Sequence, residues 1–147
     1  MNIYFICTGN TCRSPMAEAI FQSHNKEGMH VRSAGIYAMD DGDISENAKQ
    51  VIREAGIDFT HYSRQVSGED VRWADLVLTM TSAHKQLIMQ AFPFAADKIF
   101  TLKEYVRPYG SHDVSDPFGG DVYMYRQTFQ ELTQLTNELH SKLNEEQ

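Results

Sequence analysis

The chain is 147 residues long, which is enough for one domain with a single core, so we expect one domain over residues 1–147. Its hydrophobic fraction of 41% is typical of a globular protein, and no stretch approaches the roughly 20 apolar residues of a membrane span, so we expect no membrane partner. A net charge of −7 disfavours a nucleic-acid partner, because phosphate backbones bind concentrated positive charge.

The N-terminal residues and the cysteines indicate a cellular compartment. Residues 1–6 carry no basic region and are too short for a signal peptide, so they predict a buried strand in a cytoplasmic protein. Cys7 and Cys12 would close too short a loop for a stabilising disulfide, and the cytosol is reducing. A metal site would need two more ligands at short spacing, and none is near. We therefore expect no metal and no cofactor, which leaves catalysis or plain burial for both thiols.

Short apolar runs alternate with helical patterns along the chain, which is typical of a parallel sheet with helices on its faces. The predicted strands cover residues 2–7, 31–34, 75–80 and 99–102. One helix is predicted after Ser14, a second over residues 45–55, and a short third beginning at residue 67. Two more are predicted over residues 82–92 and 122–143. No repeat or Pro/Gly-rich linker divides the chain. The sequence thus predicts an α/β protein.

Local signals predict where several helices begin and end. Ser14 followed by Pro15 is typical of an N-cap with Pro at the first helical position. Ser67 with Asp70 resembles a capping box, and Gly56 predicts a C-cap. The last helix carries apolar residues at helical spacing, namely Leu132, Leu135, Leu139 and Leu143.

The most informative segment is residues 7–14, Cys-Thr-Gly-Asn-Thr-Cys-Arg-Ser, between the first predicted strand and helix. In an open parallel sheet, ligands bind beyond the carboxyl ends of the strands, where the chain turns into a helix. Such a turn directs backbone N–H groups inward, next to the positive end of the helix dipole. Gly9 permits the turn, and the guanidinium of Arg13 matches two phosphate oxygens. The segment therefore predicts a phosphate-binding loop.

Cys7 lies in this electropositive loop, so we expect a lowered pKa and a thiolate near neutral pH. A hydroxyl donated by Ser14 would lower the pKa further. The groups that bind phosphate would thereby also activate a nucleophile. The alternative is that Cys7 merely ends a buried strand, as small apolar residues often do.

The spacing of Cys7, Arg13 and Ser14 near the N-terminus resembles the low-molecular-weight protein tyrosine phosphatases. The resemblance covers essentially the whole chain and includes Met-Ala-Glu-Ala at 16–19, Arg-Ser-Ala-Gly at 32–35, Ser-Arg-Gln-Val at 63–66, Ala-Asp-Leu-Val-Leu at 74–78, and Asp116-Pro117. It implies a three-layer fold with a four-stranded parallel sheet in a flavodoxin-like arrangement. It also implies a two-step reaction through a phosphocysteine.

The resemblance implies a role for each matched residue. Cys7 would attack phosphorus while Arg13 and the loop residues hold the phosphoryl oxygens; these loop residues are Thr8, Gly9, Asn10, Thr11, Cys12 and Ser14. Asp116 would act as general acid and then as general base. Asn10 and Ser33 match positions whose side chains hold the loop in shape. From the residues alone, without the resemblance, Asp116 is interpreted as an ordinary residue of an Asp-Pro turn.

Two positions depart from the tyrosine-directed pattern. Thr11 replaces the usual Ile or Leu before Cys12, and Phe118-Gly119 stands where two tyrosines are often found. Thr11 and Phe118 together resemble the bacterial protein arginine phosphatases of the same family. A Thr hydroxyl accepts hydrogen bonds from a guanidino group, and an aromatic ring stacks on a planar guanidinium. We therefore predict a phosphoarginine phosphatase acting as a monomer on phosphorylated proteins, with a phosphotyrosine phosphatase as the alternative. Neutral drift at Thr11 is the competing explanation.

Several features stay open on the sequence alone. Cys12 is either a packing residue or the partner that traps oxidised Cys7 as a disulfide. The acidic residues at 40, 41 and 43 either favour a cationic peptide or form solvated surface, and we prefer the second. The six histidines show no paired ligand spacing and receive no role. An arsenate reductase would need cysteines beyond Cys12, and an inactive phosphate-binding module would lack the nucleophile, the arginine or the acid.

Overall fold

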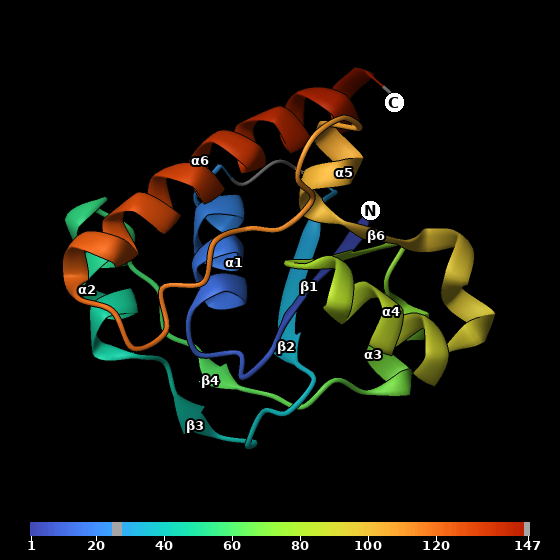
Figure 1. The fold of residues 1–147 in the computed structure, drawn as a ribbon, viewed down its shortest axis with the longest axis horizontal. Coiled ribbons are helices and arrows are strands. Elements are labelled where there is room, and N and C mark those ends of the chain that lie inside the picture. Colours follow the sequence, from blue (N-terminus) through green and yellow to red (C-terminus); the bar gives the residue numbers. More distant parts are fainter. Residues whose placement is uncertain (25–27, 146–147) are drawn as a thin grey trace.

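A computed structural model describes residues 1–24 and 28–145 (Figure 1). Its centre is a four-stranded parallel sheet in the order β2 (His30–Gly35), β1 (Asn2–Cys7), β5 (Leu76–Thr79) and β6 (Ile99–Thr101). This confirms the four strands and the parallel sheet predicted from the alternating pattern. No strand end differs from the prediction by more than one residue, which is within the usual uncertainty of such boundaries.

Two hydrophobic clusters cover the two faces of the sheet, and the side chains of β1 divide between them. Ile3 and Phe5 belong to the cluster on one face, and Tyr4 and Ile6 belong to the cluster on the other; all four are fully buried. This division follows from the two-residue period of a strand. The result is the predicted three-layer arrangement of helices, sheet and helices.

The helices of the first face are α1 (Arg13–Ser23), α2 (Glu46–Glu54), α5 (Leu102–Val106) and α6 (Val122–Glu145). The helices of the second face are α3 (Gly68–Trp73) and α4 (Ser82–Ala91). Helix α6 lies along α1 and α2 in Figure 1, and its four leucines at helical spacing are fully buried, as predicted. Among the described residues, no helix is long and apolar enough to cross a membrane.

The capping signals were right at α2 and α3 but wrong at α1. Ser45 and Ser67 cap α2 and α3 by accepting backbone N–H bonds, and Gly56 follows α2 with a positive φ of 75°. At α1 the N-cap residue is Cys12, and Ser14 lies inside the helix. Its hydroxyl is directed at Cys7 instead of at the helix N–H groups. The contact with Cys7 was expected from the sequence and is confirmed, whereas the N-cap expected at Ser14 is wrong.

Four short elements were not predicted. They are β3 (Gly42–Asp43), paired with β4 (Tyr62–Ser63) outside the main sheet, the 3-10 helix η1 (Pro93–Lys98), and α5. Helix α5 takes Leu102 from the predicted fourth strand, because Thr101 and Glu104 form a capping box there. Such short elements carry too little periodicity to be recognised from sequence.

The strand order creates the crevice that holds residues 7–14. The chain leaves β1, forms α1 and β2 on one side, and returns to β5 on the other side of β1. The connections that follow β1 and β5 therefore diverge at the carboxyl edge of the sheet, which is where open α/β sheets bind ligands. Residues 113–116 cross the same edge, because Val114 donates its N–H to the Met80 carbonyl at 2.9 Å.

Candidate active site

Residues 7–14, here called the phosphate loop, form the floor of a pocket of about 180 Å³. The floor is made by Cys7, Cys12 and Arg13, which are all buried. More accessible residues from the loop and from residues 116–118 surround the opening and are called the rim, namely Thr8, Thr11, Asp116 and Phe118. The structure thus brings Asp116 and Phe118 to the loop from about one hundred residues further along the chain.

Asn10 holds the phosphate loop in its bent shape. Its φ of 55° lies in the left-handed region, which few residues other than Gly adopt. The Asn10 amide group donates to Ser14 Oγ at 2.8 Å and to Ser33 Oγ at 2.9 Å. Its carbonyl oxygen accepts from the Arg64 N–H at 2.9 Å and contacts His61 Nε2 at 2.7 Å. These four contacts use the whole hydrogen-bonding capacity of the side chain, so they offset the cost of the bend.

His61 belongs to this support, although the sequence assigned it no role. The ring is in turn 3.7 Å from the carboxylate of Glu18 on α1, and Glu18 is 7% exposed. Asn10 and His61 are 51 residues apart in the chain, so no local spacing could have revealed the contact.

Gly35 lies directly against the backbone of the phosphate loop. It pairs with Cys7 at the carboxyl end of β2. A Cβ at this position would lie 2.5 Å from the Thr8 carbonyl oxygen and 2.7 Å from the Asn10 backbone nitrogen. These are backbone atoms that cannot swing aside, so only glycine allows the loop to pass this close to β2.

The environment of Cys7 acts on its pKa in both directions. Burial is the largest effect and raises the pKa of the thiol. The Ser14 hydroxyl at 2.8 Å, backbone N–H groups of Ser14 and Asn10, and the charge of Arg13 all lower the pKa. Burial outweighs these groups, so the net direction in the structure is a raised pKa, opposite to the lowered pKa expected from the sequence. The groups that exclude water from the sulfur are themselves hydrogen-bond donors and a cation.

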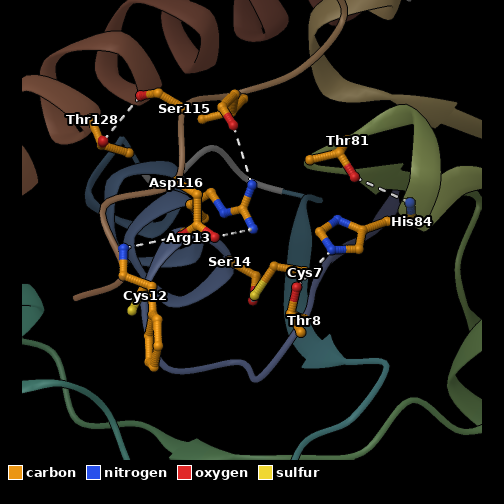
Figure 2. Close-up of polar contacts among 12 residues, drawn as sticks. Cys7, Thr8, Cys12, Arg13, Ser14, Thr81, His84, Ser115, Asp116 and Thr128 are labelled. Atoms are coloured by element: carbon orange, nitrogen blue, oxygen red, sulfur yellow. Dashed lines mark hydrogen bonds and ion pairs between the residues drawn. The ribbon is translucent and has the colours of Figure 1, made fainter. Parts of the chain in front are cut away.

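The guanidinium of Arg13 is held beside Cys7 from the far side of the pocket. Arg13 is 5% exposed, and its NH1 donates to the Val114 carbonyl oxygen at 3.2 Å. Its NH2 lies 3.4 Å from the carboxylate of Asp116 (Figure 2). Its Nε is buried and finds no hydrogen-bond partner among the described residues. A buried guanidinium with an unused donor, close to the backbone N–H groups of Ser14 and Asn10, is suited to bind an oxyanion.

Asp116 is half exposed at the rim and lies in a segment with fixed neighbours. Its Oδ1 accepts the N–H of Phe118, an Asx turn that sets the direction of the carboxylate. The preceding Ser115 donates its N–H to Glu131 on α6 and shares a hydroxyl contact with Thr128 at 3.1 Å. Asp116 is therefore a turn residue whose carboxylate also lies at the rim of the pocket, and its role as general acid stays a prediction.

The remaining predicted residues lie around this centre. Ser33 supports Asn10 from below the loop, and the Phe118 ring is 78% exposed at the rim. Cys12 is buried with its sulfur 3.2 Å from the Tyr125 hydroxyl, which fits a packing residue; disulfide trapping stays a prediction. Among residues 1–24 and 28–145, no cluster of three or more His, Cys, Asp or Glu side chains is arranged to hold a metal ion.

Comparison with known proteins gives relatives over the whole length of the chain. A protein-arginine-phosphatase of Bacillus subtilis is 48% identical and covers 99% of both chains. The solved structure of YwlE arginine phosphatase from Geobacillus stearothermophilus superimposes with a TM-score of 0.96 at 46% identity, over 99% of this chain and 94% of that one. A YwlE C7S mutant with a phosphorylated active-site serine superimposes with a TM-score of 0.94 at 46% identity, over 98% of this chain and 96% of that one.

The model of one protein family matches almost the entire chain. The match covers residues 2–147, and the family is described as low molecular weight phosphotyrosine protein phosphatase. It agrees with the sheet order, the phosphate loop and the resemblance noted from the sequence. The chain therefore belongs to the low molecular weight phosphotyrosine protein phosphatase family.

Proposed function

We propose that this protein hydrolyses phosphoarginine in proteins through a phosphocysteine on Cys7. The observation that carries the proposal is the pocket itself, in which the Cys7 sulfur lies in the floor beside Arg13 with an unused Nε donor. The relatives named protein-arginine-phosphatase, at 46–48% identity over the full length, support the substrate. The phosphorylated active-site serine of the YwlE C7S mutant supports a covalent intermediate on the nucleophile.

In the first step the Cys7 thiolate attacks phosphorus opposite the leaving guanidino nitrogen. An S–P bond forms and the P–N bond breaks, while Arg13 and the loop amides stabilise the charge on the phosphoryl oxygens. Asp116, in its acid form, gives its proton to the leaving nitrogen, so the product departs as a protein arginine. The Arg13–Asp116 distance of 3.4 Å supports this role, since Arg13 would hold the transferred group.

In the second step water hydrolyses the phosphocysteine. Asp116, now a carboxylate, accepts a proton from the attacking water as the P–O bond forms and the S–P bond breaks. Cys7 leaves as a thiolate, stabilised by the same donors that the pocket directs at its sulfur, including Ser14 at 2.8 Å. The cycle consumes only water and needs no metal or cofactor.

The composition of the rim supports phosphoarginine over phosphotyrosine. A guanidinium carries several N–H donors and a positive charge, whereas a phenyl ring carries neither. The rim offers the carboxylate of Asp116, the hydroxyl of Thr11 and the exposed ring of Phe118. Each of these groups suits a guanidinium, by ion pairing, hydrogen bonding or stacking.

We also propose that the protein acts as a monomer in the cytoplasm, where Cys7 stays reduced.

Phosphotyrosine hydrolysis is the second candidate, and the description of the family favours it. The decisive experiment measures kcat/KM of the pure enzyme for matched phosphoarginine and phosphotyrosine peptides, with Cys7→Ser as the blank. We expect a preference for phosphoarginine that shifts toward phosphotyrosine in Thr11→Ile, because the new side chain packs on a phenyl ring and loses the hydroxyl. A preference for phosphotyrosine in the unmodified enzyme would refute the substrate but leave the mechanism.

A further inference from the structure

A buried histidine holds the hydroxyl of an exposed residue on the rim. Thr8 directly follows Cys7 and is exposed, whereas His84 on α4 is only 7% exposed. Thr8 Oγ1 and His84 Nε2 lie 2.8 Å apart, although the two residues are 76 positions apart in the chain (Figure 2). The hydroxyl of an exposed threonine normally rotates freely, so this contact fixes the direction of a polar group at the pocket opening.

The position of His84 is itself well determined. It lies in the first turn of α4, and its backbone N–H donates to the N-cap residue Thr81 at 3.1 Å. Burial, and then the charge of Arg13, lowers the pKa of His84 to about 4, so the ring is neutral near pH 7. A neutral ring does not repel a guanidinium that enters the pocket beside it, as an imidazolium would.

The bond to His84 leaves Thr8 able to accept another hydrogen bond. A hydroxyl has one hydrogen and two lone pairs. If Thr8 donates to His84, both lone pairs stay free; if it accepts from His84, one lone pair stays free. In either tautomer of the ring, Thr8 Oγ1 therefore presents an acceptor of fixed position.

Thr8 lines the opening through which the leaving group would depart. With phosphorus next to Cys7 in the floor, in-line attack directs the leaving group away from the sulfur and out between the rim residues. Thr8 and Asp116 both line this opening. Among residues 1–24 and 28–145, the other rim hydroxyl, on Thr11, makes only a 3.6 Å contact with the Cys12 sulfur, so it is less firmly held. Thr8 is thus the more firmly positioned hydroxyl beside the leaving group.

We propose that Thr8, oriented by His84, accepts a hydrogen bond from the guanidino group of phosphoarginine and so helps to select it over phosphotyrosine. The inference rests on the proposed function and adds a substrate-binding residue and a positioning residue to it. Phosphotyrosine has no N–H donor at this place, so only the guanidino substrate gains the bond.

The test compares Thr8→Val with Thr8→Ser on both peptides. Valine keeps the shape and the backbone N–H but has no hydroxyl, so we expect kcat/KM for phosphoarginine to fall about tenfold more than for phosphotyrosine. Serine keeps the hydroxyl and should restore most of the preference. Equal losses on both substrates, or none, would overturn the inference. The preference of the unmodified enzyme, measured in the same assay, shows separately whether the proposed function itself fails.

The role of His84 is tested by its coupling to Thr8. His84→Phe keeps a ring but removes the nitrogen, so we expect it to lower the phosphoarginine preference of the unmodified enzyme. In the Thr8→Val background the same change should have no further effect on the preference, because the bond is already absent. Additive losses in the double variant would show that His84 acts only on the general packing and would refute its positioning role. If His84→Phe fails to fold, His84→Gln, whose side-chain amide can reach Thr8, must preserve the preference.

Discussion

Asp116 is the residue that separates catalysis from phosphate binding, because the proposed reaction needs its proton whereas binding of phosphate does not. Its carboxyl group lies 3.4 Å from Arg13, so in its protonated form it would deliver a proton beside the transferred phosphoryl group. Asp116→Asn keeps the size and the hydrogen bond to Phe118 but cannot donate that proton. We expect kcat to fall by about 10²–10⁴-fold with little change in phosphate affinity. The measurement is kcat across pH, with the inhibition constant of inorganic phosphate as the readout of binding.

The matched control changes the same charge at the opposite edge of the sheet. Asp97 is an exposed residue of η1, which precedes β6 and so lies away from the carboxyl ends of the strands. Asp97→Asn should leave kcat within about twofold, since exposed charges have small effects. If Asp116→Asn behaved like this control, Asp116 would not be the general acid.

At the scale of the elements, the close approach of the phosphate loop to β2 determines the shape of the site. Gly35→Ala would place a Cβ at 2.5–2.8 Å from three backbone atoms of residues 8–10. The loop must move, so we expect kcat/KM to fall at least tenfold, with a loss of stability of about 1–3 kcal/mol. Gly68→Ala is the control, because a Cβ there meets side-chain atoms only at 3.5 Å or more. Unchanged kcat/KM in Gly35→Ala would show that the loop is not held by this contact.

At the scale of the whole molecule, local patterns predicted the scaffold better than the site. Periodicity predicted the strands and the buried leucines of α6, because burial alternates with the period of each element. The phosphate loop was recognisable because its nucleophile, arginine and turn residues are contiguous. His61 and His84 were missed, because each reaches the loop only after the chain has folded. Ser14 was wrongly predicted as an N-cap, because it lies inside α1, but its predicted contact with the Cys7 sulfur is confirmed.

The proposed reaction depends on the ionisation of one sulfur atom, that of Cys7. Burial raises the pKa of Cys7, and the donors from the phosphate loop together with Arg13 lower it. Burial is the larger of the two in the structure. We nevertheless predict that the donors prevail in solution, because they surround the sulfur directly and are the same groups that would bind an oxyanion in this pocket. Only then is Cys7 a nucleophile at neutral pH.

The most direct test is the pH dependence of Cys7 alkylation by iodoacetamide, with peptide mass spectrometry separating Cys7 from Cys12. The thiolate reacts and the thiol does not, so the midpoint reports the pKa of Cys7. We predict a midpoint well below the value of about 8.5 of a free cysteine, and a rise in Ser14→Ala, which removes the hydroxyl 2.8 Å from the sulfur. A midpoint at or above the value of the unfolded protein would contradict attack by a Cys7 thiolate.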